Sequence, residues 1–168
     1  MYPDLKPLAP LEGARYLGIS VHAGGFGFVV IEDSIALDCG VRLCDRTQSE
    51  ECLGHQLGRI LRIYSPSAAV LLTVGSSSAA VKRKVIVNSL RRQISRHKVS
   101  FVRLNLTTLR QYFRQLNAST KYEIAQAVVN VLPELGWRLP EKRKSWQREQ
   151  HRISIFEAAA AVITYAKL

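Results

Sequence analysis

Apolar and polar positions alternate most regularly in the first third of the chain. Two short β-branched and aromatic runs, residues 16–21 and 26–31, predict strands, and Gly24-Gly25 between them predict a turn. A third strand is expected at 35–43, where apolar residues recur at every second position and predict one core-facing side: Ile35, Leu37, Cys39, Val41 and Leu43. Tight turns join the three runs, so we expect an antiparallel meander.

The rest of the chain changes between helical periodicity and short apolar runs. Strands are expected at 68–74 and 99–104, and helices at 47–64, 79–97, 107–113, 121–132 and 153–166. Thr47 begins the first helix with a capping box, Ser119-Thr120 caps the fourth, and the polar segment 137–152 is expected to be a loop. This order predicts an α/β fold, with a mixed five-stranded sheet whose first three strands are antiparallel and helices on both faces. We expect a lead-in at 1–14 and a single domain at 15–168.

Charge narrows the class of partner. The 168 residues include 24 Lys and Arg against 13 Asp and Glu, a formal net charge of +11. Such a balance favours polyanions, with nucleic acid ahead of an anionic membrane surface and of simple solubility. No apolar run is long enough to cross a bilayer, and the N-terminus lacks the order of a signal peptide, so a cytoplasmic protein with no membrane partner is expected.

Basic residues gather in two segments. The helix at 79–97 has an apolar side and six basic residues with almost no acidic partner at i+4, which favours phosphate binding over a merely solvated face: Lys82, Arg83, Lys84, Arg91, Arg92 and Arg96. The second segment lies in the loop before the last helix and consists of Lys142, Arg143, Lys144 and Trp146. Phosphate contact with indole stacking on a base and a basic loop without a ligand remain equal alternatives there.

The three cysteines allow a metal interpretation. Cys39, Cys44 and Cys52 together with His55 could form a zinc set, but the spacing lacks a C-x2-C pair and Cys39 is expected in the core. An odd number of cysteines also suits a reducing compartment. Free buried thiols are therefore the preferred interpretation.

Three motifs carry a resemblance to a known family. The first strand ends in Leu-Gly-Ile before Ser20, and a G-F-G strand follows a small-residue turn. Near the other end, residues 154–160 (SIFEAAA) follow a helix that begins at 121 with KYEIAQ. This arrangement resembles the RuvC-type Holliday junction resolvases of the RNase H-like superfamily, whose last helix carries D-A-A-D-A-L-A. In order and spacing the resemblance covers nearly the whole chain from Arg15, and it implies an RNase H-like fold.

The resemblance also implies where magnesium-binding carboxylates would lie. The matching positions are Ser20, Thr73, Ser154 and Glu157, and of these only Glu157 is acidic. Two-metal cleavage needs several carboxylate ligands, so Glu157 alone would be a weak magnesium ligand. We therefore expect a nucleic-acid-binding protein without a required cofactor, which recognises branched or structured DNA by shape and phosphate contacts and lacks the family's cleavage. A homodimer would suit a two-fold junction.

Two alternatives stay open. The chain could be an active magnesium-dependent endonuclease with a rearranged site, to which Glu32, Asp33, Asp38 or His151 would contribute. In the simpler interpretation Glu32 and Asp33 are turn residues, Asp38 is a solvated strand position and His151 is a polar loop residue. A third possibility is a protein-interaction or assembly subunit that reuses the fold. All three rest on one geometric prediction, that the first strand and the last helix lie side by side and bring Ser20 and Glu157 into a common pocket.

Overall fold

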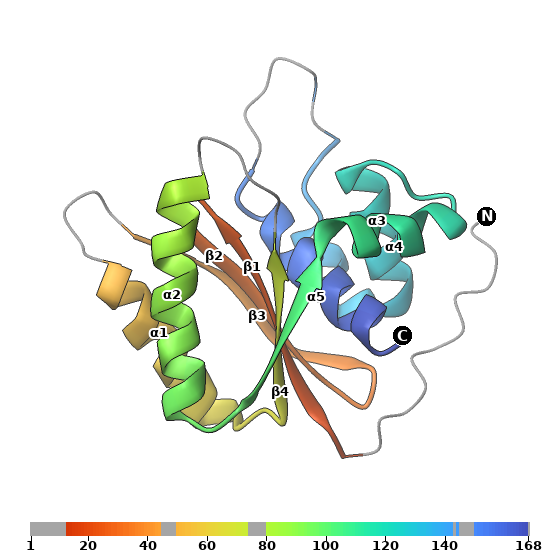
Figure 1. Ribbon diagram of the computed structural model, residues 1–168. Coiled ribbons are helices and arrows are strands. Elements are labelled where there is room, and N and C mark those ends of the chain that lie inside the picture. Colours follow the sequence, from red (N-terminus) through yellow and green to blue (C-terminus); the bar gives the residue numbers. More distant parts are fainter. Residues whose placement is uncertain (1–12, 45–49, 74–79, 143, 145–149, 168) are drawn as a thin grey trace.

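The computed structural model describes residues 13–44, 50–73, 80–142, 144 and 150–167 (Figure 1). In chain order its elements are β1 (Arg15–His22), β2 (Gly25–Glu32), β3 (Ile35–Leu43), α1 (Glu50–Tyr64), β4 (Ala68–Thr73), α2 (Ala80–Arg96), β5 (Ser100–Asn105), α3 (Leu106–Gln115), α4 (Lys121–Val131), the 3-10 helix η1 (Pro133–Arg138) and α5 (Ile153–Tyr165). The sequence predicted the type and approximate position of each strand and α-helix. The expected lead-in and the capping box at Thr47 lie largely outside the described residues.

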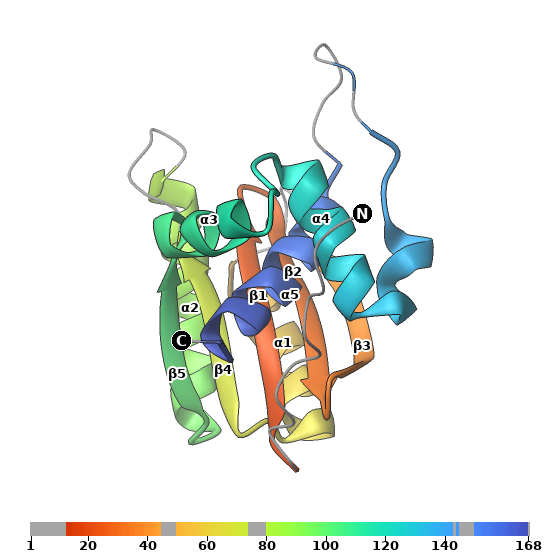
Figure 2. The ribbon, with the colours of Figure 1, turned by 90° about the vertical axis from the view of Figure 1, so that its right-hand side faces the viewer.

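One five-stranded sheet, in the order β3-β2-β1-β4-β5, forms the centre of the molecule. The pairs β1–β2 and β2–β3 are antiparallel, whereas β1–β4 and β4–β5 are parallel. Helices α1 and α2 cover one face, and α5 covers the other with α3 and α4 beside it (Figure 2). These findings confirm the predicted mixed sheet with helices on both faces. No helix in the part of the chain that the structure describes combines the length and apolarity needed to cross a bilayer.

Strand β3 corrects the expected alternation. Its pairing with β2 shifts between Val30 and Ile31, so that Val29 pairs with Cys39 but Ile31 pairs with Ala36. A bulge of this kind inserts an extra residue and reverses the alternation on its two sides. Cys39 and Val41 pack toward the α5 side as predicted, and the bulge adds Ala36 to that side. The other residues of the predicted core face stay 44–50% exposed: Ile35 and Leu37 at or before the bulge, and Leu43 at the end of the strand.

Helix α5 lies unusually close to the sheet because β1 and β2 each place a glycine beneath it. A Cβ added at Gly18 would lie 2.3 Å from the carbonyl oxygen of Ala158, and one added at Gly27 would lie 2.2 Å from Ser154 Oγ. The run Ala158–Ala161 is fully buried, so small side chains on both elements allow the contact. This contact fixes the position of Glu157 relative to β1.

Helix starts show which capping predictions hold. The Thr120 side chain accepts from the Glu123 amide, and the Glu123 side chain accepts from the Thr120 amide, so the predicted cap of α4 is a full capping box. Helix α3 was expected to begin with Thr107 or Thr108, but Asn105 is its cap and accepts from the Thr107 amide.

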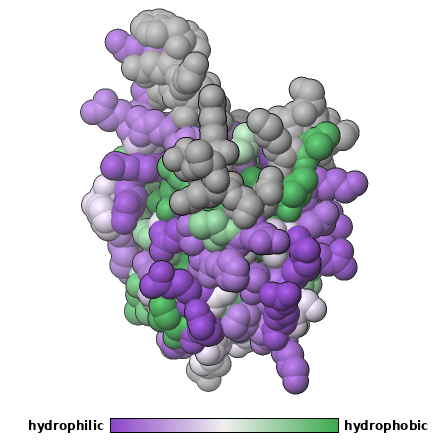
Figure 3. All heavy atoms as spheres, turned by 90° about the vertical axis from the view of Figure 1, so that its left-hand side faces the viewer, coloured by the Kyte–Doolittle hydropathy of each residue, from purple (hydrophilic) through white to green (hydrophobic). Residues whose placement is uncertain are grey.

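On the other face of the sheet, the surface that α1 and α2 turn to solvent is largely hydrophilic (Figure 3).

Candidate functional site

A pocket of about 340 Å³ opens at the carboxyl end of β1. Because β4 and β5 run parallel to β1, the carboxyl ends of all three strands meet at this edge of the sheet, the usual place for a site in such folds. Its charged and imidazole-bearing lining residues come from β1, α2, α3, α4, the segment before α5 and α5 itself: His22, Arg83, Arg110, Lys121, His151 and Glu157. Three side-chain cations therefore face a single carboxylate. We call this the cationic pocket.

Ser20 and Glu157 lie side by side, as the resemblance predicted. The Ser20 hydroxyl donates to Glu157 Oε2 at 3.0 Å, although the two residues are 137 positions apart in the chain. Ser20 is 2% exposed and lies beneath the carboxylate, and Lys121 Nζ lies 3.0 Å from the other oxygen, Oε1. Both oxygens of the carboxylate thus contact a donor of this chain.

The other two matching positions are occupied differently. Ser154 lines the pocket, but its hydroxyl donates to the His151 carbonyl at 2.6 Å and packs on Gly27. Thr73 donates to the Leu104 carbonyl of β5 at 3.1 Å, and it does not appear among the described lining residues of the pocket. Both hydroxyls satisfy backbone carbonyls, so neither is held as a ligand pointing at Glu157.

These residues do not fit a catalytic metal. Magnesium needs several hard oxygen ligands, and a two-metal site needs carboxylates that bridge the ions. Among the described residues, no group of three or more His, Cys, Asp or Glu side chains comes close enough together to hold a metal ion. A cation at Glu157 would also have to displace the Lys121 ammonium from Oε1.

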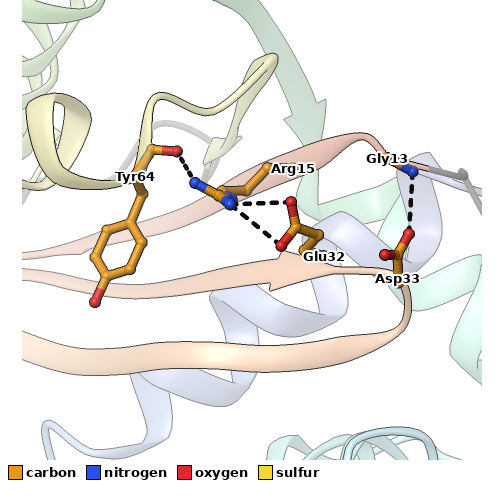
Figure 4. A network of polar contacts seen from close by, with 5 residues as sticks. All are labelled: Gly13, Arg15, Glu32, Asp33 and Tyr64. Carbon is orange, nitrogen blue, oxygen red and sulfur yellow. Dashed lines mark hydrogen bonds and ion pairs between the residues drawn. The ribbon is translucent and has the colours of Figure 1, made fainter.

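Two of the acidic residues considered as replacements, Glu32 and Asp33, lie at the opposite end of the first two strands (Figure 4). Arg15 Nη2 contacts both Glu32 oxygens, at 3.0 and 3.2 Å, and its Nη1 donates to the Tyr64 carbonyl. Asp33 accepts from the Gly13 amide at 3.1 Å. Asp33 therefore lies in a turn, as the simpler interpretation had it, whereas Glu32 is the last residue of β2 and forms an ion pair with Arg15.

Asp38 is more than a solvated strand position. Its carboxylate accepts from the Tyr64 hydroxyl at 2.8 Å and from the Cys39 amide, which ties β3 to the end of α1. Burial, followed by this hydrogen bond, raises the pKa of the Tyr64 phenol. Asp38 is thus a structural acid away from the cationic pocket.

His151, by contrast, belongs to the pocket. Its ring stacks on His22 with centroids 4.6 Å apart and an angle of 23° between the planes. His22 in turn accepts from the Gly24 amide through Nδ1 at 3.3 Å. The loop before α5 is therefore joined to the end of β1 by an imidazole pair at the pocket.

The predicted basic residues separate into two groups. Arg83 lines the cationic pocket, and its buried Nε has no hydrogen-bond partner among the described residues. Lys84, Arg91, Arg92 and Arg96 are exposed along α2, and Lys142 and Lys144 are exposed before α5. The Lys82 side chain, Arg143 and Trp146 lie outside the described residues.

The cysteines do not support the zinc interpretation. In the part of the chain that the structure describes, Cys39, Cys44 and Cys52 form no disulfide bond, and all three are partly rather than fully buried. Burial raises the pKa of the Cys39 thiol, and a thiol with a raised pKa is less reactive.

Sequence reasoning missed Lys121, Arg110, His22 and Gln150 as parts of the pocket. A signal existed only for Lys121, which follows the α4 cap and begins the helix that resembles the family's lysine-initiated helix. The others are single polar residues in ordinary local contexts, and only the topology brings them together.

Comparison with known proteins gives likeness in structure alone. No family model and no curated protein sequence matches the chain. RuvC from T. thermophilus, solved in complex with a Holliday junction substrate, superposes with a TM-score of 0.69 at 16% identity, covering 91% of this chain and 93% of that one.

A second solved structure gives the same result. The yeast mitochondrial Holliday junction resolvase Ydc2 superposes with a TM-score of 0.68 at 14% identity, covering 98% of this chain and 80% of that one. The large terminase nuclease of phage G20c is more distant, with a TM-score of 0.54. Strand order, helix placement and these superpositions together show that the chain has the RuvC-like variant of the RNase H-like fold.

Proposed function

We propose that this protein binds nucleic acid, with branched or structured DNA as its preferred form, and holds a backbone phosphate in the cationic pocket. Side-chain cations take the place that metal ions would need, and the protein does not cleave the strand by a metal-dependent route. The proposal concerns a binding protein built on a nuclease-like fold.

One observation carries the proposal: the carboxylate at the end of the sheet is already neutralised by this chain. Glu157 contacts Ser20 through one oxygen and Lys121 through the other, both at 3.0 Å. With that charge compensated, Arg83 and Arg110 remain to attract an anion. Guanidinium groups bind phosphate oxygens well because their donors form a planar fork.

The surface beyond the pocket supports a polyanion rather than a small anion. Arg83 lies near the start of α2 and Arg96 at its end, and at 1.5 Å per residue they are about 20 Å apart along the helix. Arg91 and Arg92 are exposed between them. At roughly 100° per residue, Arg92 and Arg96 point away from the side of α2 that carries Arg83, so these cations add a positive field that attracts a polyanion rather than one line of phosphate contacts.

The structural neighbours support a branched substrate. The T. thermophilus RuvC structure contains a Holliday junction, and Ydc2 is a Holliday junction resolvase. Transfer of that preference to this chain belongs to the proposal, because the likeness is one of fold. Homodimer formation, a cytoplasmic location and the single-domain boundary at 15–168 stay predictions.

Salt-dependent binding tests the proposal. A labelled four-way DNA and a linear duplex of the same length are titrated in EDTA at several salt concentrations. We expect tighter binding to the four-way DNA and a steep fall of log affinity with log salt. Arg110→Gln should lower the slope by about one, as expected for one lost phosphate contact. Arg62→Gln, a change at an exposed arginine in the last turn of α1, is the matched control and should leave the slope unchanged.

Two results would overturn the proposal. The first is absence of binding to either DNA at low salt, which would favour a protein-interaction role. The second is binding whose slope responds equally to Arg62→Gln and Arg110→Gln, which would show a diffuse basic surface without a phosphate pocket.

A further inference from the structure

A second pocket, of about 330 Å³, adjoins the cationic pocket. The two share Lys121, Gln150 and Ile153 as common wall residues. Tyr122 and Pro140 belong to the second pocket alone, as do the charged side chains of Glu141 and Lys142 at its rim. Two adjoining pockets with one wall between them suit a ligand that has two chemically different parts.

The second pocket offers apolar contact with a few polar groups. Pro140 is buried, Ile153 is 9% exposed, and the Tyr122 ring is partly exposed, so together they give a flat ligand an apolar surface. The Glu141 carboxylate accepts hydrogen bonds, while the Gln150 amide both donates and accepts. An apolar lining with a small number of such groups is typical of sites for small ring systems, and the volume falls in the range of those sites.

We infer that the second pocket takes one unpaired nucleobase of the nucleic acid whose phosphate lies in the cationic pocket. This inference rests on the proposed function. The base would lie against Tyr122, and its amino and ring-nitrogen edge would meet Glu141 and Gln150. A nucleotide joins a flat ring to an anion over a short distance, which is the combination that the shared wall requires. Unpaired positions at a branch supply such a base with little unstacking cost.

Trp137 provides a control for this assignment. It is the more exposed aromatic residue, at 71%, but the Arg138 guanidinium lies 4.0 Å over its ring. Trp137 is not among the described lining residues of either pocket. If exposure alone decided base stacking, Trp137 and not Tyr122 would bind the base.

The experiment compares two strands with equal numbers of phosphates. One is a seven-residue abasic strand, and the other carries a single 2-aminopurine nucleotide at its centre. We expect the wild type to bind the one-base strand about tenfold more tightly, as stacking of one base on an aromatic ring gives, with a change in 2-aminopurine fluorescence. Tyr122→Ala should remove this difference and leave binding of the abasic strand unchanged, whereas Tyr122→Phe and Trp137→Ala should retain the difference.

The outcomes separate the two proposals. Equal affinity of the wild type for both strands would overturn the base pocket and leave phosphate binding in place. A difference that survives Tyr122→Ala, or that Trp137→Ala removes, would place the base elsewhere and also overturn this inference. Absence of binding to both strands would overturn the proposed function and the inference together. Circular dichroism of each variant shows whether it is folded.

Discussion

The two ends of β1 differ in what their charged side chains do. At its amino end, Arg15 contacts Glu32 and the Tyr64 carbonyl, and nearby Asp33 and Asp38 accept from Gly13 and Tyr64. Every one of these acids therefore has a partner that ties strands, turns and α1 together. At its carboxyl end, one carboxylate lies among cations from three helices. Three acids therefore support the fold at the amino end of β1, whereas three cations line the pocket at its carboxyl end, where a ligand could use them.

The largest expected effect comes from separating α5 from the sheet. In Gly18→Ala the new Cβ would lie 2.3 Å from the backbone oxygen of Ala158 and must push α5 away from β1. We expect a loss of about 3 kcal/mol in the free energy of unfolding, measured by urea denaturation. Gly136→Ala, where the nearest atom would be 3.5 Å away in a side chain, is the control and should have a much smaller effect. Similar losses in both variants would contradict the close packing that positions Glu157.

The second largest loss of stability is expected when an acid is placed at the carboxyl end of β1. Ser20→Asp places a second carboxylate beside Glu157 in a position that is 2% exposed. Without metal we expect it to be about 2 kcal/mol less stable than the neutral, similarly shaped Ser20→Asn, because like charges repel in a buried site. Added Mn²⁺ should recover part of that loss for the aspartate variant alone, seen as a rise in the melting temperature. Equal stability of the two variants, with or without Mn²⁺, would be evidence against a shared pocket at this position.

Arginine substitutions at the two ends of β1 separate support of the fold from binding. Arg15→Gln should lower the free energy of unfolding by about 1 kcal/mol, because it removes a partly exposed ion pair and a backbone contact, and should leave DNA affinity unchanged. Arg110→Gln should leave the free energy of unfolding unchanged and weaken DNA binding, since Arg110 is exposed and lines the cationic pocket. Chemical denaturation and a salt titration on the same two variants check this. The comparison fails if Arg15→Gln weakens DNA binding as much as Arg110→Gln does.

An effect no larger than that of Arg15→Gln concerns the start of α4, which presents Lys121 to the pocket. Thr120→Ala should cost about 1 kcal/mol, the usual value of an N-cap. Hydrogen bonds from the Thr120 and Ser119 amides lower the pKa of Glu123 below its ordinary value of 4.5. Because the pKa of Glu123 is lower in the folded state, the stabilisation from its carboxylate is complete above the pKa of the unfolded state. It is lost as the pH falls through the pKa of the folded state.

The pH dependence of unfolding tests that sign. Unfolding midpoints measured from about pH 6 down to pH 3 should fall less steeply for Glu123→Gln than for the wild type, because the glutamine has no proton to gain. Identical pH profiles for the two proteins would show that the Glu123 carboxylate does not support the cap.

The order and type of the elements could be predicted because local patterns determine them. The β-branched runs of β1 and β2, the helical periodicity of α2 and the Thr120 capping box each depend on residues close in sequence. The bulge in β3 could not be predicted, since the alternation from Ile35 to Leu43 looks uninterrupted and only pairing with β2 reveals the extra residue. Ile35 and Leu37 were wrongly predicted on the core face for that reason, whereas Cys39 and Val41 do pack toward the core.

The site could be predicted only in part. The contact between Ser20 and Glu157 followed from the resemblance, which placed the two positions on paired elements. The cations around them come from α2, α3 and α4, and no local pattern distinguishes Arg110 from other exposed arginines. Position in the tertiary structure, and not residue type, makes these side chains a site.

The affinity for a labelled four-way DNA, measured in EDTA and again with Mn²⁺, tests the central claim most directly, with strand scission followed in the same samples. If side-chain cations bind the phosphate in place of metal, added Mn²⁺ brings no gain in affinity, because it only competes for the phosphates, and the strands stay intact. Binding that requires Mn²⁺, together with scission that Glu157→Ala abolishes, would contradict the account and show an active nuclease.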